Sequence, residues 1–301
     1  MSQTSSHSQD LQLSWLNQDI EQRMMFRGGR ATSTNLRLSC IIAVLLTVSI
    51  YALLIPFLTT SIAAYFTKRG PVPYFITFFT FWSFAILFLK WRKLAFQRRT
   101  LHLEIVPSNS EFILSPANVD IVHEQIRNQV DDPKHFVLFN RIEAALSNLR
   151  NLGRVTDVGE ILQSQAEVDE SAMETSYMGV TAFVWAIPVL GFIGTVLGLS
   201  SAVGGFGSVL QTSQEIDSLK SALQDVTGGL AIAFDTTLMG LLAAMVIQLI
   251  MVFLKKAELE FLDRCSEYCS RNIVNKLRLI PFQQESITEK QRANIVSHET
   301  V

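Results

Sequence analysis

The stretch "AIAFDTTLMGLLAAMVIQLIMVFL", residues 231–254, decides the class of this fold. It is a largely apolar run, and it is long enough to cross a lipid bilayer as a helix, which takes about 20 residues. Asp235, beside Thr236 and Thr237, interrupts the run. A charged side chain inside a bilayer costs on the order of 3 kcal/mol on insertion scales, so this carboxylate is a candidate functional group.

Three other stretches are also apolar and long enough to cross a bilayer. With the first stretch they predict four spans, at about 38–66, 70–89, 179–204 and 228–254. Pro56 lies inside the first span, where a kink or a local break tolerates it. The chain is 49% hydrophobic and 17% charged, with a mean hydropathy of +0.28, whereas soluble domains are roughly a quarter charged. We predict an all-α integral membrane protein with four transmembrane helices, a helical cytoplasmic insert and a helical C-terminal extension.

Basic residues near the ends of the spans indicate the orientation, because Lys and Arg mark the cytoplasmic side. They precede the first span and follow the second and the fourth, as Arg23, Arg27, Arg30, Arg37, Lys90, Arg92, Lys93, Arg98, Arg99, Lys255 and Lys256. The predicted outer connections carry fewer, namely Lys68, Arg69 and Lys220. Both termini are therefore predicted to be cytoplasmic. The predicted parts are a cytoplasmic N-terminal segment, the first pair of spans, the insert, a core with the third and fourth spans, and a C-terminal helix and tail: 1–37, 38–89, 90–178, 179–254 and 255–301.

The insert is predicted to consist of helices. Ser115 and Pro116 have the residue types of a helix N-cap and first turn, and apolar residues follow at helical spacing. The polar stretch from Val155 is predicted to run as a helix straight into the third span. The residues after the fourth span have near-helical apolar spacing and continue that helix.

The sequence argues against several other classes of protein. It contains no GxxxxGK[ST], HExxH, GxSxG or paired-cysteine motif. Its three cysteines have no zinc spacing, and the net charge of -2 gives no basic excess for nucleic-acid binding. We therefore expect no enzyme activity, no metal site, no cofactor and no nucleic-acid partner.

Small residues share one face of each of the last two predicted spans. On the third span these are Gly191, Thr195, Gly198 and Ala202, near Gly194, and on the fourth Ala233, Thr237, Gly240 and Ala244. Small faces let two helices approach closely in lipid, so the glycines are candidates for helix packing. Two interpretations are open for the threonines. They either bond back to their own helices within a packing seam or present hydroxyls to an ion.

Two segments resemble a known family. "AIPVLGFIGTVLGL", residues 186–199, followed by "GGLAIAFDTTLMGLLAAMVIQ", residues 228–248, is similar to the signature of the MotA/TolQ/ExbB proton channel family of ion-driven motor subunits. The resemblance extends from about residue 165 to about residue 260. An N-terminal pair of spans before a large insert is closer in placement to MotA than to the three-span TolQ and ExbB.

The resemblance implies an ion-conducting motor stator of the bacterial cell inner membrane. In that family five copies surround two single-span helices of a MotB/TolR/ExbD-like partner, whose intramembrane aspartate takes up and releases the ion. Thr195 and Thr237 match the family threonines that line the pore, and Pro188 matches a proline coupled to conformational change. The transported ion is expected to be H+ or Na+. The process driven, whether flagellar rotation, outer-membrane energisation with protein transport, gliding or defence, is left open.

Two alternative functions with the same fold are open for this chain, a non-conducting membrane scaffold and a stand-alone cation channel.

The ion pathway is predicted to involve Thr195, Thr237, Asp235 and Thr236. In helical projection, however, Asp235 lies about 200° from Thr237, so it should face a neighbouring helix or subunit.

Three interpretations of Asp235 are open. It is a second ion or proton site at a subunit interface, a structural carboxylate bonded to a hydroxyl of an adjacent helix, or an outer-leaflet group reached by water. The candidate hydroxyls are Ser200, Ser201 and Thr195.

Overall fold

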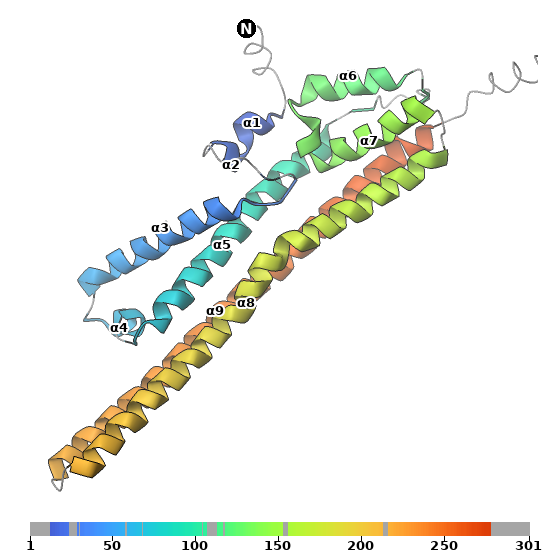
Figure 1. The fold of residues 1–301 in the computed structure, drawn as a ribbon. Coiled ribbons are helices and arrows are strands. Elements are labelled where there is room, and N and C mark those ends of the chain that lie inside the picture. Colours follow the sequence, from blue (N-terminus) through green and yellow to red (C-terminus); the bar gives the residue numbers. More distant parts are fainter. Residues whose placement is uncertain are drawn as a thin grey trace, which may run out of the picture. The chain divides into compact units, whose positions relative to one another are not determined.

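The structure is a computed structural model that describes residues 13–23, 29, 31–57, 59–67, 69–103, 105–106, 113–116, 118–152, 156–212 and 216–277. The α-helices are α1 Trp15–Gln18, α2 Ile20–Arg23, α3 Leu36–Leu54, α4 Ser61–Thr67, α5 Val72–Gln97, α6 Val119–Gln129, α7 Val137–Leu152, α8 Thr156–Thr212 and α9 Ile216–Asn272 (Figure 1). Short 3-10 helices are Ile55–Phe57, Arg98–His102, Pro133–His135 and Val274–Lys276. Within these described ranges β pairing is limited to two isolated bridges, which confirms the all-α fold.

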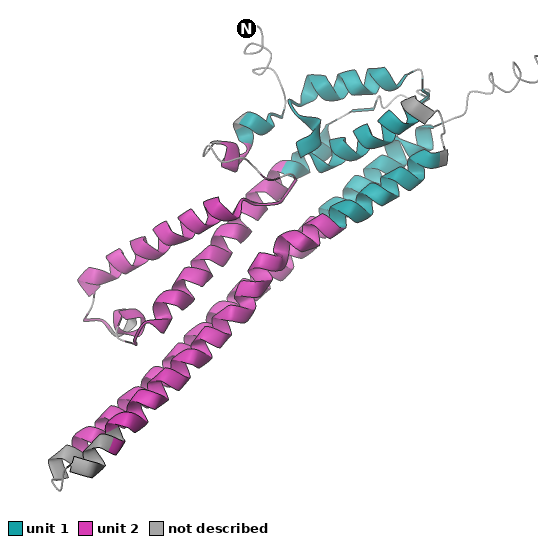
Figure 2. Ribbon diagram, in the orientation of Figure 1, with its two compact units in different colours: residues 1–18, 97–170, 260–301 teal, residues 19–96, 171–259 magenta. Residues whose placement is uncertain are grey.

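The chain divides into two compact units (Figure 2). Unit 1 comprises Met1–Gln18, Gln97–Glu170 and Glu260–Val301, and unit 2 comprises Asp19–Phe96 and Ser171–Leu259. These divisions differ from the five predicted parts because α5, α8 and α9 each contribute residues to both units. The last predicted part is only partly visible, since residues 278–301 lie outside the described ranges.

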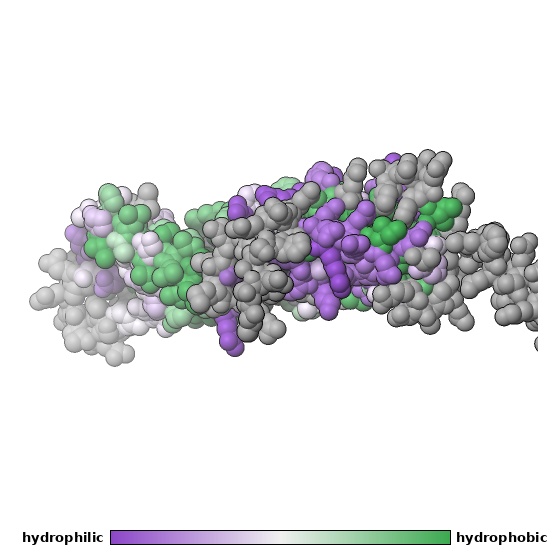
Figure 3. Space-filling view, turned by 90° about the horizontal axis from the view of Figure 1, so that it is seen from above, coloured by the Kyte–Doolittle hydropathy of each residue, from purple (hydrophilic) through white to green (hydrophobic). Residues whose placement is uncertain are grey.

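Four helical stretches are long and apolar enough to cross a membrane, which confirms a multi-pass membrane protein. They are Leu36–Phe57, Val72–His102, Asp157–Gly205 and Lys220–Lys276. Both α8 and α9 have 57 residues, so the third and fourth spans extend into polar helix as predicted. Large apolar side chains are exposed along them, including Trp185 at 75% and Phe234 at 66%. Figure 3 shows hydrophobic surface, in green, beside hydrophilic surface, in purple, on the face that it draws.

The first predicted span is shorter in the structure than the sequence indicated. Helix α3 ends at Leu54, Pro56 lies in the 3-10 turn that follows, and α4 begins at Ser61. Proline has no N–H to donate to the carbonyl four residues earlier, so the α-helical hydrogen-bond pattern is interrupted at Pro56. The α-helix therefore tightens at Ile55, whose N–H bonds to the carbonyl of Ala52.

Helix α6 of unit 1 also begins later than predicted. It starts at Val119 after Asn118, whereas Ser115 and Pro116 lie in the preceding turn. The N–H of Leu114 donates to the carbonyl of Lys276 at 2.9 Å, which holds this part of the chain extended. The prediction of a cap at Ser115 was wrong because a contact with the distant C-terminal segment takes precedence over the local motif.

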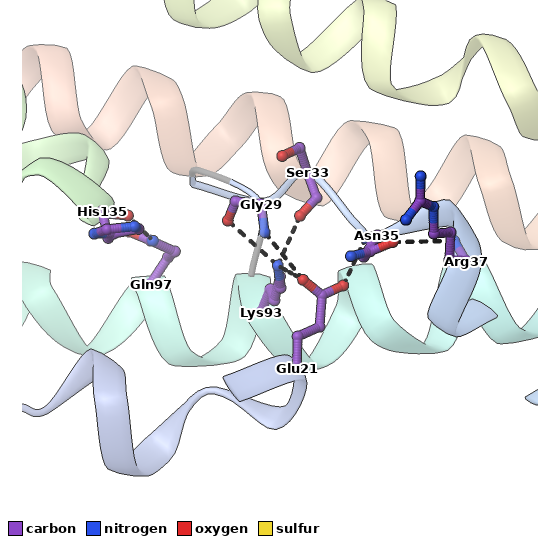
Figure 4. A network of polar contacts seen from close by, with 8 residues as sticks. All are labelled: Glu21, Gly29, Ser33, Asn35, Arg37, Lys93, Gln97 and His135. Carbon is purple, nitrogen blue, oxygen red and sulfur yellow. Dashed lines mark hydrogen bonds and ion pairs between the residues drawn. The ribbon is translucent and has the colours of Figure 1, made fainter. Parts of the chain in front are cut away.

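In unit 2 the polar N-terminal segment is held against α5 by a buried ion pair (Figure 4). The Nζ atom of Lys93 lies 2.6 Å from Oε2 of Glu21 and 2.7 Å from the carbonyl oxygen of Ser33. The other oxygen of Glu21 accepts from the N–H of Asn35 at 2.8 Å. Asn35 in turn caps α3 by accepting from the N–H of Arg37 at 3.0 Å. The cap that starts the first span is thus fixed to the second.

Candidate functional site

Within unit 2, α8 and α9 approach so closely that a methyl group would not fit at several glycines. A Cβ atom at Gly194 would lie 2.7 Å from the Cβ of Thr236, and one at Gly198 would lie 2.8 Å from the carbonyl oxygen of Gly229. Real Cβ contacts are longer than this, so glycine is required for these two backbones to pack as they do. Two further predicted glycines also face the partner helix, where an added Cβ would meet a carbonyl oxygen at 3.0 Å: Gly191 and Gly240.

Two threonines meet at this seam. The hydroxyls of Thr195 and Thr237 are hydrogen-bonded to each other. The hydroxyl of Thr237 lies 3.2 Å from the carbonyl oxygen of Gly191, and that of Thr195 lies 3.1 Å from the carbonyl oxygen of Ala233. Both side chains remain partly exposed. Because each hydroxyl has one proton but two acceptor lone pairs, the pair has oxygen lone pairs to offer to a cation or to water.

Thr236 has a different environment from its neighbour. It is 1% exposed, and its hydroxyl donates within its own helix, 3.1 Å from the carbonyl oxygens of both Ile232 and Ala233. Its side chain fills the space opposite Gly194. The sequence placed Thr236 in the ion pathway, whereas the structure encloses it between α8 and α9, away from the exposed side where Thr195 and Thr237 offer their hydroxyls.

Asp235 forms an ion pair with a basic residue of the connection between α4 and α5. Its Oδ2 lies 2.6 Å from Nη2 of Arg69, with side chains 16% and 25% exposed respectively. The Tyr65 ring lies beside this pair, with its centre 5.6 Å from the Arg69 guanidinium. We call Tyr65, Arg69 and Asp235 the Asp235 cluster. It supports the structural interpretation of Asp235, with a guanidinium in place of the predicted hydroxyl partners Ser200, Ser201 and Thr195.

Replacing Asp235 with asparagine should therefore reduce stability without changing the pH profile of ion-dependent function. Asparagine keeps the shape but removes the charge that Arg69 pairs with, a loss of about 1.5–3 kcal/mol for a hydrogen bond to a charged group. Arg69→Gln should cost a similar amount, and the double variant should cost less than the sum. Thermal unfolding of the purified complex measures the first effect. A shifted pH profile at unchanged stability would instead identify Asp235 as a titrating group.

A second polar group of side chains is buried between α5, α8 and α9. The Oε2 atom of Glu258 accepts from the Tyr177 hydroxyl at 2.7 Å and lies 3.4 Å from Nζ of Lys90. Its Oε1 accepts from the hydroxyl of Thr32. Lys90 also lies 4.1 Å from the centre of the Tyr177 ring. We call Thr32, Lys90, Tyr177 and Glu258 the Glu258 cluster; both charged members are at most 2% exposed.

The sequence did not identify this cluster. Lys90 was counted only as one of the basic residues that mark the cytoplasmic side, and Glu258 only as part of a polar helix. The sequence does contain one signal: Tyr177 comes just before the third predicted span and Glu258 just after the fourth, at the ends predicted to lie on the same side of the membrane. The pattern does not show, however, which of the several nearby lysines faces inward.

Pro188 lies inside α8, which continues through it. Its ring leaves the carbonyl of the residue four positions earlier without a helical donor. The preceding carbonyl, that of Ile187, faces α9 at Gly240. The weakened turn of α8 therefore lies directly at the seam with α9, about two turns from Thr195.

Comparison with known proteins agrees with the resemblance in the sequence. Residues 130–266 match the model of the MotA/TolQ/ExbB proton channel family. The match includes the threonine pair, Asp235 and Glu258, and it leaves out α3, α4 and α5. No match to the chain was found among curated proteins or among solved structures.

Proposed function

We propose, from the membership of residues 130–266 in the MotA/TolQ/ExbB proton channel family, that the chain is an ion-conducting stator subunit. With a partner it would convert proton or sodium motive force across the bacterial inner membrane into rotation or force. The single observation that carries this proposal is the Thr195–Thr237 hydroxyl pair. It lies on the partly exposed side of two membrane helices that glycines hold tightly together.

The chemistry of the pair requires a second component. Threonine hydroxyls can coordinate a cation or order water, but they do not exchange a proton at physiological pH, so a titrating group must lie close by. Asp235 is a poor candidate because it is already ion-paired with Arg69 and lies about 200° around the helix from Thr237. We therefore assign the titrating carboxylate to a single-span MotB/TolR/ExbD-like partner with an intramembrane aspartate.

Exposed apolar side chains support assembly with further copies. Phe192, Val203, Leu238 and Met245 are each at least 53% exposed in the single chain. Side chains of this kind on a membrane helix face either lipid or a neighbouring subunit. Enclosing the threonine pair around a partner helix would need several copies, and we propose the pentamer of the family, with both termini in the cytoplasm.

The function is tested by reconstituting the chain in liposomes with and without the single-span protein that co-purifies with it. An imposed membrane potential should drive proton or sodium uptake only when both proteins are present, and a pH- or sodium-sensitive dye reports it. Uptake by the chain alone would support a stand-alone channel instead. Absence of uptake in both preparations would support a non-conducting scaffold.

A further inference from the structure

Unit 1 contains an open pocket where the Arg98–His102 3-10 helix meets the last turns of α9. Its volume is about 320 Å³, which is at the lower end of the range of about 300–1,000 Å³ for small-molecule sites. The lining residues are Arg98, Leu101, His102, Arg264, Glu267, Tyr268, Arg271 and Asn272.

The lining is strongly basic. Three guanidinium groups and one imidazole face a single carboxylate. Glu267 lies three residues after Arg264 and four before Arg271, spacings at which helical side chains are neighbours. Even so, neither of these two arginines forms an ion pair with another residue in the described part of the chain.

The walls of the pocket are held by the packing of unit 1. On α9, Cys265 and Cys269 are fully or almost fully buried, at 0% and 2% exposure, so Arg264 and Arg271 project from a helix whose other face is fixed. The hydroxyl of Tyr268 donates to the carbonyl oxygen of Leu103 at 3.4 Å. This contact ties α9 to the end of the 3-10 helix that contributes the remaining basic groups.

We propose that this pocket binds a phosphate-bearing anion. Guanidinium groups bind phosphate oxygens with paired, charge-assisted hydrogen bonds. Arg264 and Arg271 form no ion pair in the described part of the chain, so they leave positive charge beside the open volume, which a multiply charged anion would neutralise. The proposal does not depend on ion conduction, because it concerns unit 1 alone.

The phosphate could belong to a soluble metabolite or to a lipid headgroup. Along α9, Arg264 and Arg271 follow the predicted end of the fourth span at residue 254 by about 15 and 25 Å, at about 1.5 Å per residue. A headgroup layer adds only some 5–7 Å on each side of the hydrocarbon core. The spacing therefore favours a soluble phosphate compound, such as a diphosphate or the phosphates of a nucleotide.

In the test, inorganic pyrophosphate is titrated into the full-length complex in detergent, and isothermal titration calorimetry measures its binding. Saturable binding should weaken by more than about tenfold in Arg264→Gln/Arg271→Gln, because two charged hydrogen-bond donors are lost. Arg99→Gln is the matched control, since Arg99 is exposed beside Arg98 but does not line the pocket; its affinity should stay within about twofold. Glu267→Gln should tighten binding. A control titration with sodium chloride at the same ionic strength shows how much of the heat comes from general screening of charge rather than from pyrophosphate binding.

A second arm distinguishes the two sources. The complex is placed in nanodiscs of phosphatidylcholine alone or with phosphatidylglycerol, and thermal stability is compared. Stabilisation by phosphatidylglycerol that the double variant loses, without pyrophosphate binding, would support the site and identify a lipid headgroup as the ligand. Equal pyrophosphate affinity in the wild type and the double variant, or absence of both effects in the wild type, would overturn the proposal.

Discussion

Valine at both Thr195 and Thr237 is expected to abolish ion-dependent function while leaving the complex assembled. Valine has nearly the same shape as threonine, so the seam can still close, but it removes the two hydroxyl oxygens that meet at its exposed side. Without them an ion or its water loses two hydroxyl contacts at this seam. Dye-reported ion uptake in liposomes should fall to the background level, at an unchanged elution volume of the purified complex.

Thr181→Val is the matched control for this experiment. Thr181 lies on the same helix, but its hydroxyl lies 3.1 Å from the carbonyl oxygen of Tyr177 in its own helix, and it is remote from Thr237. This variant should keep most of the uptake. Normal uptake in Thr195→Val/Thr237→Val would remove the threonine pair from the ion pathway.

Glu258→Ala should lower the stability of the protein by about 3–5 kcal/mol, the usual cost of removing one partner of a buried ion pair. The change leaves the ammonium group of Lys90 buried and uncompensated, and it leaves the hydroxyls of Tyr177 and Thr32 without their acceptor. Because these residues come from α5, α8 and the N-terminal segment, several elements of unit 2 lose a shared contact. Denaturant unfolding of the purified complex measures the effect.

An exposed pair in the same unit gives the comparison. Lys255 and Glu174 lie 3.0 Å apart with side chains 39% and 60% exposed, and pairs of this kind contribute about 0–1 kcal/mol. Glu174→Ala should therefore be almost neutral. If Glu258→Ala were equally mild, the Glu258 cluster would not be a buried polar network that unit 2 depends on.

The membrane spans could be predicted because the bilayer sets a simple condition on length and polarity. That condition identified four spans, and the glycine and threonine spacing identified the faces that meet in the seam. The bilayer condition did not locate the end of the first span, because the break at Pro56 depends on local backbone geometry. The capping pattern at Ser115 also failed to locate the start of α6, because this part of the chain contacts the distant segment at Lys276.

Hydrophobic periodicity could not predict the side chains that contact the carboxylates of Asp235 and Glu258. Helical projection showed that Asp235 faces away from Thr237, but the approach of Arg69 depends on how the connection after α4 folds back. The Glu258 cluster combines side chains from four separate parts of the chain, and no local pattern specifies that combination. Thr236 was predicted to belong to the ion pathway together with Asp235 and Thr237, because the sequence alone does not distinguish a hydroxyl enclosed between two helices from one at the edge of their contact.

Native mass spectrometry of the complex, gently extracted from its own membrane, tests the central claim most directly. The account predicts five copies of this chain with two copies of a single-span protein that has an aspartate within its span. The partner's remaining domain would then indicate which process the motor drives. An oligomer of this chain that contains no such partner would contradict the stator function and favour a stand-alone channel or a scaffold.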